Sequence, residues 1–437
     1  MSSASGPQNL TRRDFTKVVA GFSAATALGV SSVRSSGKSN RPVRVGWIGT
    51  GRRGGHDMRQ LLNKCDDVEL VAMADVFPDH LDAARQMLKN KLDDSVYQSK
   101  VKVGDDDAYV GLDAYRKVLE RDDVDLIVHS TPPGFRPKHF SEAIAAGKHV
   151  FMEKPAATDP TGIRTILDAA AEADRKGLSV VVGTQQRHMP NFHALMKRVE
   201  DGQMGELVSG QAFWHGGTFK WHWHPHKAEW SDTEYQIRSW PYFTWLGGDC
   251  VVEQHVHFLD VLNWFFGRPP SSVLGRGGRQ QRTGEQFGNV YDHFSAELNY
   301  GQNLYASSFN SQMKGASGRT GVRLIGTKGV AWVDRSSAQI RGANDWKYDG
   351  PMHGGTATAL QALLKAIHTD KPINEAPQLA EATLTGIMIR ESAYTGRELK
   401  WQWALKGSKQ DLFHENLSLD QDLAVRPVAV PGQTKLR

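Results

Sequence analysis

The stretch VRVGWI (43–48) runs directly into GTGRRG (49–54). The first six residues are mostly apolar and partly β-branched, which predicts a short buried strand, and a helical pattern follows the glycines. A G-x-G-x-x-G sequence between a strand and a helix is typical of a loop that binds the pyrophosphate of a dinucleotide. Its glycines allow the tight turn, the approach of backbone to phosphate and the packing of helix on strand. The predicted cofactor-binding residues here are Gly49, Gly51, Arg52, Arg53 and Gly54.

A second apolar run, 68–74, ends at Asp75. This carboxylate follows the glycine loop by about twenty residues, where it can accept hydrogen bonds from the adenosine ribose. We therefore expect NAD as the cofactor. NADP stays open, because Arg52 and Arg53 could receive a 2′-phosphate, and Asp75 could instead cap the helix that begins near Pro78.

The alternation of strands and helices continues to about residue 187. Apolar runs over 124–130 and 178–184 are separated by helical segments, and a third run leads into EKP (153–155). This alternation predicts a parallel sheet, so we assign 41–187 to a Rossmann dinucleotide-binding domain of α/β class. Ligands bind at the carboxyl ends of such strands. The residues at these ends that we expect to contact the cofactor are Thr131, Pro132, Glu153 and Lys154.

The glycine loop, the acid at a strand end and Glu153-Lys154-Pro155 after a strand together resemble the glucose-fructose oxidoreductase / inositol dehydrogenase / MocA (Gfo/Idh/MocA) family. The resemblance covers nearly all of the chain after its first forty residues. It implies that Lys154 lies beside the nicotinamide and the substrate hydroxyls, in a position fixed by the Pro155 turn. The alternative is a surface lysine in a proline turn.

After Gly205 the pattern changes to short β-rich runs. They predict an α+β domain, 188–400, with a large, mostly antiparallel open sheet, and 401–437 is expected to be an extended C-terminal arm or loose end. The resemblance implies that helices cover one face of this sheet and that the other face serves in a homo-oligomer. The predicted strands are 206–214, 272–278, 291–300, 303–311, 321–325 and 330–333.

The stretch GGDCVVEQHVHFLD (247–260) resembles the family's Asp-x-Gly-x-His-x-x-Asp pattern. His257 matches the catalytic histidine and Asp260 the final acid, while Glu253 replaces the first Asp and His255 replaces the Gly. On one helix, Glu253, His257 and Asp260 share a face, so the two carboxylates could orient the imidazole.

Oxidation of an alcohol needs a group that takes the hydroxyl proton, and histidine suits this task near neutral pH. We therefore predict His257 as the general base and Lys154 as the group that polarises the same oxygen. The alternative for His257 is a core histidine that is hydrogen-bonded to backbone.

Aromatic and imidazole side chains are concentrated between 214 and 245. Flat apolar faces with polar edges suit a sugar, whose C–H faces stack while its hydroxyls are hydrogen-bonded, although an aromatic core is the alternative. The predicted substrate-binding residues are Gln186, Gln236, Arg238, Trp240, Asp249, Glu253 and His257.

Three histidines, His222, His224 and His226, would lie on one face of a strand and raise the question of a metal site. Pro225 disturbs a strand, however, and no carboxylate partner is evident. We therefore predict no metal.

Residues 1–38 contain Arg12-Arg13, an apolar run over 18–30 and a serine-rich stretch, in that order. This order is typical of a twin-arginine export signal, so we expect a periplasmic or otherwise exported protein that meets the twin-arginine translocase. The alternative is an amphipathic helix with a chance arginine pair. Because an exported enzyme cannot readily exchange NADH with a soluble pool, we expect a tightly bound cofactor.

Most of the net charge lies in this N-terminal segment. Its five basic residues and one acidic residue mean that removal lowers the formal charge from +5 to +1. The remainder gives no electrostatic reason to expect a nucleic-acid partner. Cys65 and Cys250 are the only cysteines in the sequence, which excludes a disulfide-stapled scaffold.

Three function classes fit these observations. The first is a pyridine-nucleotide oxidoreductase acting on a sugar or cyclic polyol hydroxyl. The second is a glycosidase that oxidises a sugar hydroxyl, eliminates across the ring, adds water and reduces the sugar again with the same cofactor. The third is a non-catalytic nucleotide or sugar sensor, against which the presence of both Lys154 and His257 argues.

Overall fold

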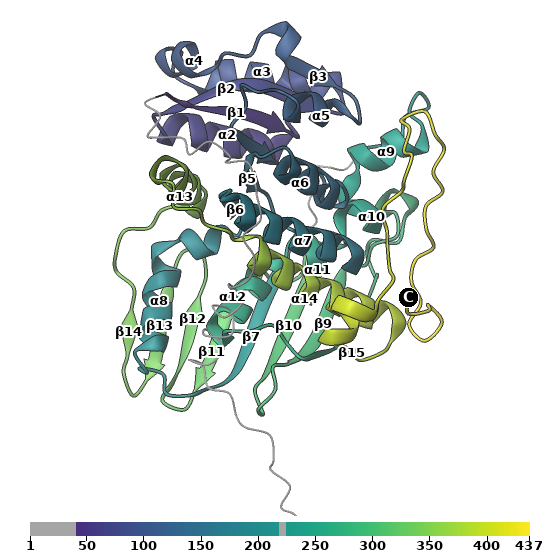
Figure 1. The fold of residues 1–437 in the computed structure, drawn as a ribbon. Coiled ribbons are helices and arrows are strands. Elements are labelled where there is room, and N and C mark those ends of the chain that lie inside the picture. The colour runs from purple at the N-terminus through teal and green to yellow at the C-terminus, as the bar shows by residue number, and fades with distance from the viewer. Residues whose placement is uncertain (1–40, 218–223) are drawn as a thin grey trace, which may run out of the picture. The chain divides into compact units, whose positions relative to one another are not determined.

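A parallel sheet with the strand order β3-β2-β1-β4-β5-β6 forms the first half of the fold (Figure 1). The computed structural model describes residues 41–217 and 224–437, so the predicted export signal lies outside the described residues. The strand order reverses between β1 and β4, and such a switch point is where ligands bind in open α/β sheets. The strands are β1 (Val43–Ile48), β2 (Val68–Asp75), β3 (Ala108–Val110), β4 (Leu126–His129), β5 (His149–Met152) and β6 (Val180–Val182).

Helices cover both faces of this sheet because its strands are apolar on both sides. Val45 and Trp47 of β1 are fully buried against the core formed with α2, α3 and α13, whereas Ile48 packs on the opposite side with α5, α6 and α7. The helices are α2 (Arg52–Lys64), α3 (Pro78–Lys91), α4 (Asp94–Lys100), α5 (Ala114–Leu119), α6 (Arg136–Ala145), α7 (Pro160–Lys176) and α13 (Gly355–Thr369), with short turns η1 (Asp105–Asp107) and η2 (Pro133–Phe135).

The boundary expected at residue 187 is crossed by α13. This helix comes from the later part of the chain, yet its Leu360 and Leu363 are fully buried in the core of the first sheet. Gly355 begins the helix so close to Gln185 that a Cβ there would lie 1.9 Å from the Gln185 carbonyl oxygen. The nucleotide-binding part is therefore not a continuous segment of sequence.

The second sheet has the order β14-β13-β12-β11-β7-β10-β9-β8-β15. Its neighbouring strands are antiparallel except β7 and β10, which pair in parallel with Phe213 opposite Phe309. The predicted open and mostly antiparallel sheet is confirmed. The strands are β7 (Leu207–Gly216), β8 (Ser272–Gly278), β9 (His293–Asn299), β10 (Tyr305–Gln312), β11 (Arg319–Gly326), β12 (Gly329–Val333), β13 (Ala338–Gly342), β14 (Trp346–Lys347) and β15 (Leu399–Lys400).

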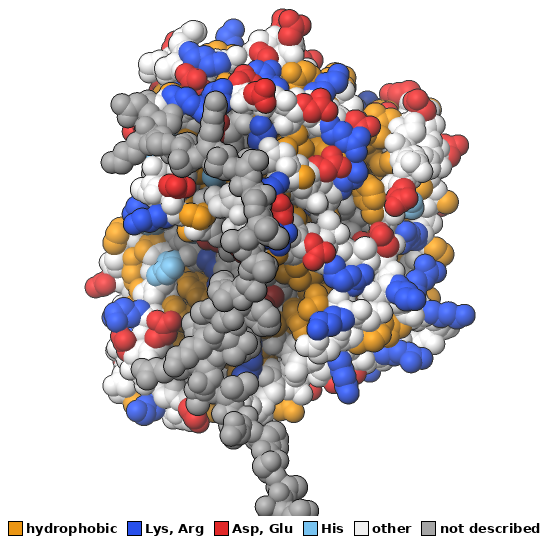
Figure 2. Space-filling view, viewed as in Figure 1, with side chains coloured by type: hydrophobic (Ala, Val, Ile, Leu, Met, Phe, Trp, Pro, Cys, Tyr) orange, Lys and Arg blue, Asp and Glu red, His pale blue; other side chains and the backbone are white. Residues whose placement is uncertain are grey.

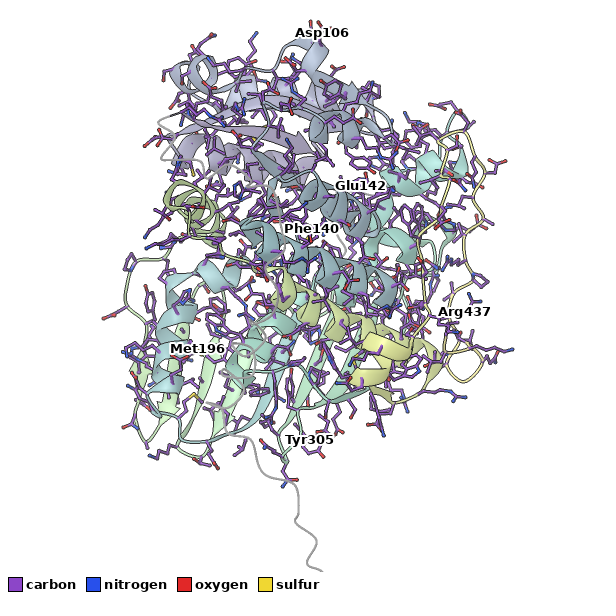
Figure 3. The ribbon with its side chains drawn as sticks, viewed as in Figure 1. Asp106, Phe140, Glu142, Met196, Tyr305 and Arg437 are labelled. Carbon is purple, nitrogen blue, oxygen red and sulfur yellow. The ribbon has the colours of Figure 1, made fainter. Side chains whose placement is uncertain are left out.

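Helices pack on one face of the second sheet, as Figure 1 shows, where α8, α12 and α14 lie across the strands. In Figure 3, Met196 marks α8 on this side, and Tyr305 marks the start of β10 at the sheet's lower rim. The helices and turns are η3 (Gln185–His188), α8 (Pro190–Glu200), α9 (Asp232–Arg238), η4 (Trp240–Tyr242), α10 (Thr244–Gly247), α11 (Cys250–Glu253), α12 (Val256–Phe266), η5 (Glu285–Phe287), α14 (Ala376–Thr395) and the π-helical turn η6 (Trp403–Gly407).

The C-terminal segment is extended, as expected, but it is not loose. It runs beside α9 and α10 in Figure 1, and it buries Leu412 and Leu423 in an aromatic-rich core. Backbone oxygens of the arm accept hydrogen bonds from the α9 segment, including that of Gln421 from the Thr233 hydroxyl at 2.7 Å. At the end of the chain, labelled in Figure 3, the Arg437 carbonyl accepts from Ser408 at 2.8 Å. The arm is thus a packed part of the fold.

The described surface carries charges of both signs. In the view of Figure 2, Lys and Arg side chains are interspersed with Asp and Glu. Both cysteines are buried and unpaired. Within residues 41–217 and 224–437, no helix is long and apolar enough to cross a membrane.

Candidate active site

A cleft of about 960 Å³ runs from the glycine loop to the helices on the second sheet. Its first wall is formed by the carboxyl ends of β1, β2, β4 and β5. Its second wall includes residues of β7, α9, α11, α12 and the turn after β12. The predicted residues that line it are Gly49, Gly51, Arg52, Arg53, Asp75, Thr131, Pro132, Glu153, Lys154, Arg238, Trp240, Glu253 and His257.

The glycine loop is shaped for a phosphate-bearing ligand. Gly49 has a φ of 83°, and a Cβ there would lie 2.7 Å from the Thr131 nitrogen. A Cβ on Gly54 would lie 2.2 Å from the Gly49 oxygen, which explains the close packing of helix on strand. A Cβ on Gly51 would meet nothing within 4 Å, and no side chain caps the N-terminus of α2 at this residue. The open space and the free end of the helix dipole fit the pyrophosphate of a dinucleotide.

Asp75 ends β2 and braces the same loop. Its carboxylate accepts hydrogen bonds from the Thr50 backbone nitrogen at 2.7 Å and from the Thr50 hydroxyl at 3.1 Å. The other oxygen lies 3.1 Å from His80, whose pKa is raised because the hydrogen bond and charge of Asp75 outweigh its desolvation. Asp75 therefore reaches the cleft with part of its hydrogen-bonding capacity already used by the protein.

Arg53 is held in an ion-pair network beneath the loop. Its guanidinium lies 2.7 Å from Glu153 and 3.0 Å from Asp57. Burial raises the pKa of Asp57 well above its ordinary value, although Arg53 opposes the shift. Because Arg53 is committed to these carboxylates, it joins the cofactor loop to the Glu153-Lys154 segment at the end of β5.

Lys154 is fixed by the segment that contains Glu253. Its ammonium group donates to the Glu253 carboxylate at 2.7 Å and to the Glu253 carbonyl at 2.6 Å. Both side chains are largely buried, with 10% and 14% of their surface exposed. A lysine ammonium has three donors, so one donor remains for a ligand in the cleft. The peptide bond to Pro155 is cis.

His257 lies on α12 and lines the cleft near Lys154. The ring stacks on Trp214 with a centroid separation of 6.1 Å, and its Nδ1 is buried without a hydrogen-bond partner among the described residues. Desolvation first, and then the positive charges of Lys154 and Arg335, hold the pKa of His257 well below its ordinary value. His257 is therefore neutral at physiological pH and able to accept a proton through its other nitrogen.

The predicted carboxylate support for His257 is wrong. α11 ends at Glu253, and α12 begins at Val256, so Glu253 and His257 do not share the face of one helix. Glu253 instead binds Lys154, and Asp260 is buried in a bidentate pair with Arg187 at 2.8 to 3.0 Å. The break at Gln254 and His255 is the physical reason, because it turns Glu253 toward β5.

Three other predicted substrate residues do not line the cleft. Gln186 is fully buried. Gln236 donates to the Leu423 carbonyl and accepts from the Trp245 indole at 2.8 Å, so both ends of its amide are used within the core. Asp249 is fully buried at a φ of 76° and accepts from the backbone nitrogen of Tyr291 at 2.7 Å. The last two residues hold the walls of the site together rather than face a ligand.

Arg238 lies at the end of the cleft away from Lys154 and His257. Its guanidinium lies 3.8 Å from the centroid of Phe77 and forms a bidentate pair with Asp79 at 3.0 Å. Phe77 follows Asp75 at the end of β2, beside the region where an adenosine would lie. Arg238 therefore joins α9 to the nucleotide-binding part, and its position does not support a direct role in reading a sugar.

Thr131 belongs to a small buried histidine cluster. Its hydroxyl lies 2.7 Å from His129 Nε2 and 3.4 Å from His139 Nδ1. Desolvation lowers the pKa of His139 to about 3, so this ring is neutral. The cluster forms an uncharged floor under the end of β4.

Arg335 is a cleft residue that the sequence analysis missed. It lies in the turn after β12, and its guanidinium is 6.0 Å from the Trp214 ring centroid. Its signal is weak in the sequence, because Asp334-Arg335-Ser336-Ser337 reads as an ordinary polar turn. Only the fold brings this turn to His257.

The histidines considered for a metal do not form a site among the described residues. His222 lies outside those residues. His226 stacks on Tyr235 at 4.4 Å, whereas His224 lines the cleft and packs edge-on against Trp230 at 6.2 Å. Within residues 41–217 and 224–437, no three His, Cys, Asp or Glu side chains are grouped to hold a metal ion.

A Rossmann sheet with an open glycine loop, and a lysine and a histidine in the same cleft, define a nucleotide-dependent oxidoreductase class. Residues 43–184 match the oxidoreductase family with an NAD-binding Rossmann fold, and residues 192–332 match the GFO/IDH/MocA C-terminal domain. The chain belongs to the Gfo/Idh/MocA family of NAD(P)-binding oxidoreductases.

Among curated proteins, the chain is 30% identical to an alpha-N-acetylgalactosaminidase of Shewanella oneidensis over 226 residues, or 47% of this chain and 46% of that protein. It is 29% identical to a glycosyl hydrolase family 109 protein of Streptomyces coelicolor, covering 40% of this chain and 34% of that protein. The chain thus spans less than half the length of these relatives.

Solved structures show the same fold. Aldose-aldose oxidoreductase from Caulobacter crescentus aligns with a TM-score of 0.64 at 17% identity, covering 82% of this chain and all of that one. Myo-inositol 2-dehydrogenase from Lactobacillus plantarum aligns with a TM-score of 0.62 at 18% identity, covering 82% of this chain and 99% of that one.

Proposed function

We propose that this protein is an NAD-dependent oxidoreductase that moves hydride between the nicotinamide and a carbon bearing a hydroxyl group on a sugar or cyclic polyol. The carrying observation is that Lys154 and His257, which lie far apart in the sequence, line the same cleft as the glycine loop. Family membership supports this proposal. When bound, NAD supplies the hydride acceptor.

The chain's own residues manage the hydroxyl proton. Lys154 is held by Glu253 and donates a hydrogen bond to the substrate oxygen, which stabilises the negative charge that develops there. His257 Nε2 takes the proton, because Nδ1 is enclosed and unpaired. A neutral imidazole can accept a proton, and the nearby Lys154 charge favours its subsequent release. The same groups serve in the reverse direction.

Separate Lys154→Ala and His257→Ala variants test this assignment. Each is expected to lower kcat for sugar-dependent NAD reduction by about 10²-fold or more, because each removes a proton or charge interaction of the transition state. NAD binding, followed by tryptophan fluorescence, serves as the control for folding. Unchanged biological activity of both variants would instead identify a sensor.

A glycosidase that oxidises, eliminates, hydrates and reduces its sugar is the second candidate, and the two curated relatives named above favour it. Its redox steps use the same Lys154 and His257. Incubation with p-nitrophenyl α-N-acetylgalactosaminide and NAD separates the two candidates. Release of p-nitrophenol without accumulation of NADH supports the glycosidase, whereas NADH formation from free sugars without aglycone release supports the oxidoreductase.

Tight retention of the cofactor is a further part of the proposal. The ion pair of Arg238 with Asp79 and its contact with Phe77 close the adenosine end of the cleft, and the C-terminal arm pins α9 behind it. Arg238→Gln is expected to increase the rate of NADH release, measured by stopped-flow fluorescence with excess NAD. Arg175→Gln, which removes an exposed ion pair with Glu172, is the matched control. Equal release rates for both variants would contradict the closure.

Self-association through the open face of the second sheet is also proposed. Phe213 and Phe309 stack on this face at 5.4 Å, next to Trp332, and Arg319 lies over Phe213. Leu274, Tyr305 and Val330 on strands of the same sheet are exposed large hydrophobic side chains, which supports a partner surface, and a second copy of the chain fits it. Sedimentation analysis of Phe309→Glu is expected to show smaller particles than the wild-type protein.

Export by the twin-arginine translocase remains a proposal that rests on residues 1–38. Replacing Arg12 and Arg13 together by Lys is expected to keep the protein in the cytoplasm. Cell fractionation, with the cofactor content of each fraction, provides the measurement.

A further inference from the structure

The turn between β12 and β13 is held rigidly by its own polar groups. The Asp334 carboxylate accepts hydrogen bonds from the Trp332 indole and the Ser336 backbone nitrogen, both at 2.8 Å. The Asn191 amide, at the start of α8, donates to the Asp334 carbonyl at 2.8 Å. The backbone that carries Arg335 is therefore fixed from two sides before any ligand arrives.

The Arg335 guanidinium, in contrast, has no hydrogen-bond or ion-pair partner within residues 41–217 and 224–437. It is accessible to solvent and lines the same cleft as Trp214 and His257, with its guanidinium 6.0 Å from the Trp214 ring centroid. Nearby cations are already engaged, because Lys154 pairs with Glu253, Arg53 pairs with Glu153 and Arg136 donates to the Pro155 carbonyl. Arg335 thus places a positive charge without a carboxylate partner among the described residues on a preorganised turn of the cleft.

The electrostatic surroundings agree with this geometry. Desolvation by the cleft walls and the charge of Arg53 lower the pKa of Arg335, and Arg335 in turn lowers the pKa of His257. An anion bound beside Arg335 would oppose the lowering of the pKa of Arg335 and that of His257. Such an anion would also raise the basicity of His257, so that binding and proton transfer would be linked.

We propose that Arg335 binds a carboxylate on the substrate, which makes the substrate class an acidic sugar such as a uronic acid. The inference rests on the proposed function and specifies its substrate. A guanidinium presents two parallel donors that match a carboxylate, and the neighbouring Trp214, which is largely buried, contributes an apolar part of the cleft wall beside it. Lys154 and His257 remain available for the reacting hydroxyl.

A phosphate group of the cofactor shares the anionic chemistry that Arg335 recognises. The two sources are distinguished by measuring NAD binding and sugar binding separately. Arg335→Gln removes the charge, Arg335→Lys retains charge without the forked donor pair, and Arg341→Gln is the matched control from the same hairpin, where Arg341 forms an exposed ion pair with Asp345.

The experiment uses the full-length protein loaded with NAD and two matched pairs of probes, D-glucuronate with D-glucose and D-galacturonate with D-galactose. Isothermal titration gives Kd, and NADH absorbance gives kcat/KM. Wild-type protein is expected to prefer at least one acid over its neutral partner by about tenfold or more. Arg335→Gln should lose that preference, Arg335→Lys should retain part of it, and Arg341→Gln should match the wild type.

Equal affinity of wild-type protein for acids and neutral sugars would overturn the inference. So would weakened NAD binding in Arg335→Gln with an unchanged preference for acids, which would assign Arg335 to the cofactor. Redox turnover of neutral sugars alone would leave the proposed function in place while rejecting the acidic substrate. Arg335-dependent binding of an acid without any hydride transfer or glycoside cleavage would support the ligand class and reject the proposed function.

Discussion

The surroundings of His257 determine the protonation state in which it works. Its ring is enclosed by Trp214 on one side, and Lys154 and Arg335 supply positive potential, while no carboxylate among the described residues is hydrogen-bonded to the ring. Protonation of the His257 ring in the ligand-free protein is therefore unfavourable. Under the proposed function, His257 is a base that is ready at neutral pH and that gives up its proton easily once the substrate has reacted.

This environment predicts an unusual pH profile. Because the pKa of His257 lies well below its ordinary value, kcat/KM in the oxidative direction should show no inflection from this group between about pH 6 and 7.5, and the loss of activity should begin at lower pH. The measurement is kcat/KM against pH with a buffer of constant ionic strength. An acid limb centred near pH 6.5 that disappears in His257→Asn would contradict the assigned surroundings.

The sequence allowed two site residues to be predicted, Lys154 and His257, but not the roles of Glu253 and Arg335. Lys154 and His257 were found from the sequence because each lies in a patterned segment. The partnership of Glu253 with Lys154 was missed, because a continuous helix was assumed through a stretch that breaks at Gln254. Arg335 gave no local signal, since its role depends on a turn of the second sheet meeting α12, which is a tertiary contact.

At the scale of elements, the β1–α2 unit depends on glycines that have different tasks. Gly54 is required by packing, because a Cβ would collide with the Gly49 oxygen and lie 2.6 Å from the Trp47 indole nitrogen. Gly51 has open space around its Cβ position and an ordinary φ of −62°. Gly54 is therefore required for the packing of helix on strand, whereas Gly51 leaves space for the ligand.

Substitution by alanine is expected to have different effects at Gly54 and at Gly51. Gly54→Ala should destabilise the protein by about 1–3 kcal/mol through overpacking, whereas Gly51→Ala should leave stability within about 0.5 kcal/mol. Gly51→Ala should nevertheless weaken NAD binding, because its methyl group would stand in the path of the pyrophosphate. Urea unfolding and NAD titration of both variants provide the measurements. Intact NAD binding by Gly51→Ala would place the pyrophosphate elsewhere.

Most elements were predictable because their periodicity is local. The strand over 43–48 was placed at its observed bounds, and so was that over 272–278. The parallel pairing of β7 with β10 and the packing of α13 on the first sheet were not predicted. Both depend on contacts between segments far apart in the sequence, for which a single sequence carries little information.

At the scale of the whole molecule, the core contains several neutral histidines. Burial lowers the pKa of His139 and of His255 to about 3, and it holds those of His129 and His257 well below their ordinary value. In the unfolded chain such groups titrate near pH 6.5. The unfolded state therefore binds more protons below that pH, and the folded state loses stability as the pH falls.

The contribution of His255 to this loss of stability at low pH can be calculated and measured. With a folded pKa of about 3, it should remove about 2 kcal/mol of the free energy of unfolding between pH 7 and pH 5. His255→Gln, which retains a donor for Ser308, removes the titrating group. The variant is expected to be less stable at pH 7, but its stability should fall by about 2 kcal/mol less over this interval. If the free energy of unfolding, measured with urea, changed equally with pH in the wild type and in His255→Gln, a neutral buried His255 would be contradicted.

The C-terminal arm also links distant parts of the sequence mechanically. Residues around Leu412 to Leu423 complete the support of α9, and α9 in turn carries Arg238 to the end of β2. The hydrogen bond from Thr233 to Gln421 spans 188 residues of sequence, so two segments far apart in the chain hold one wall of the cleft. A change confined to the arm is therefore expected to loosen α9 and Arg238 together, although the arm itself does not line the cleft.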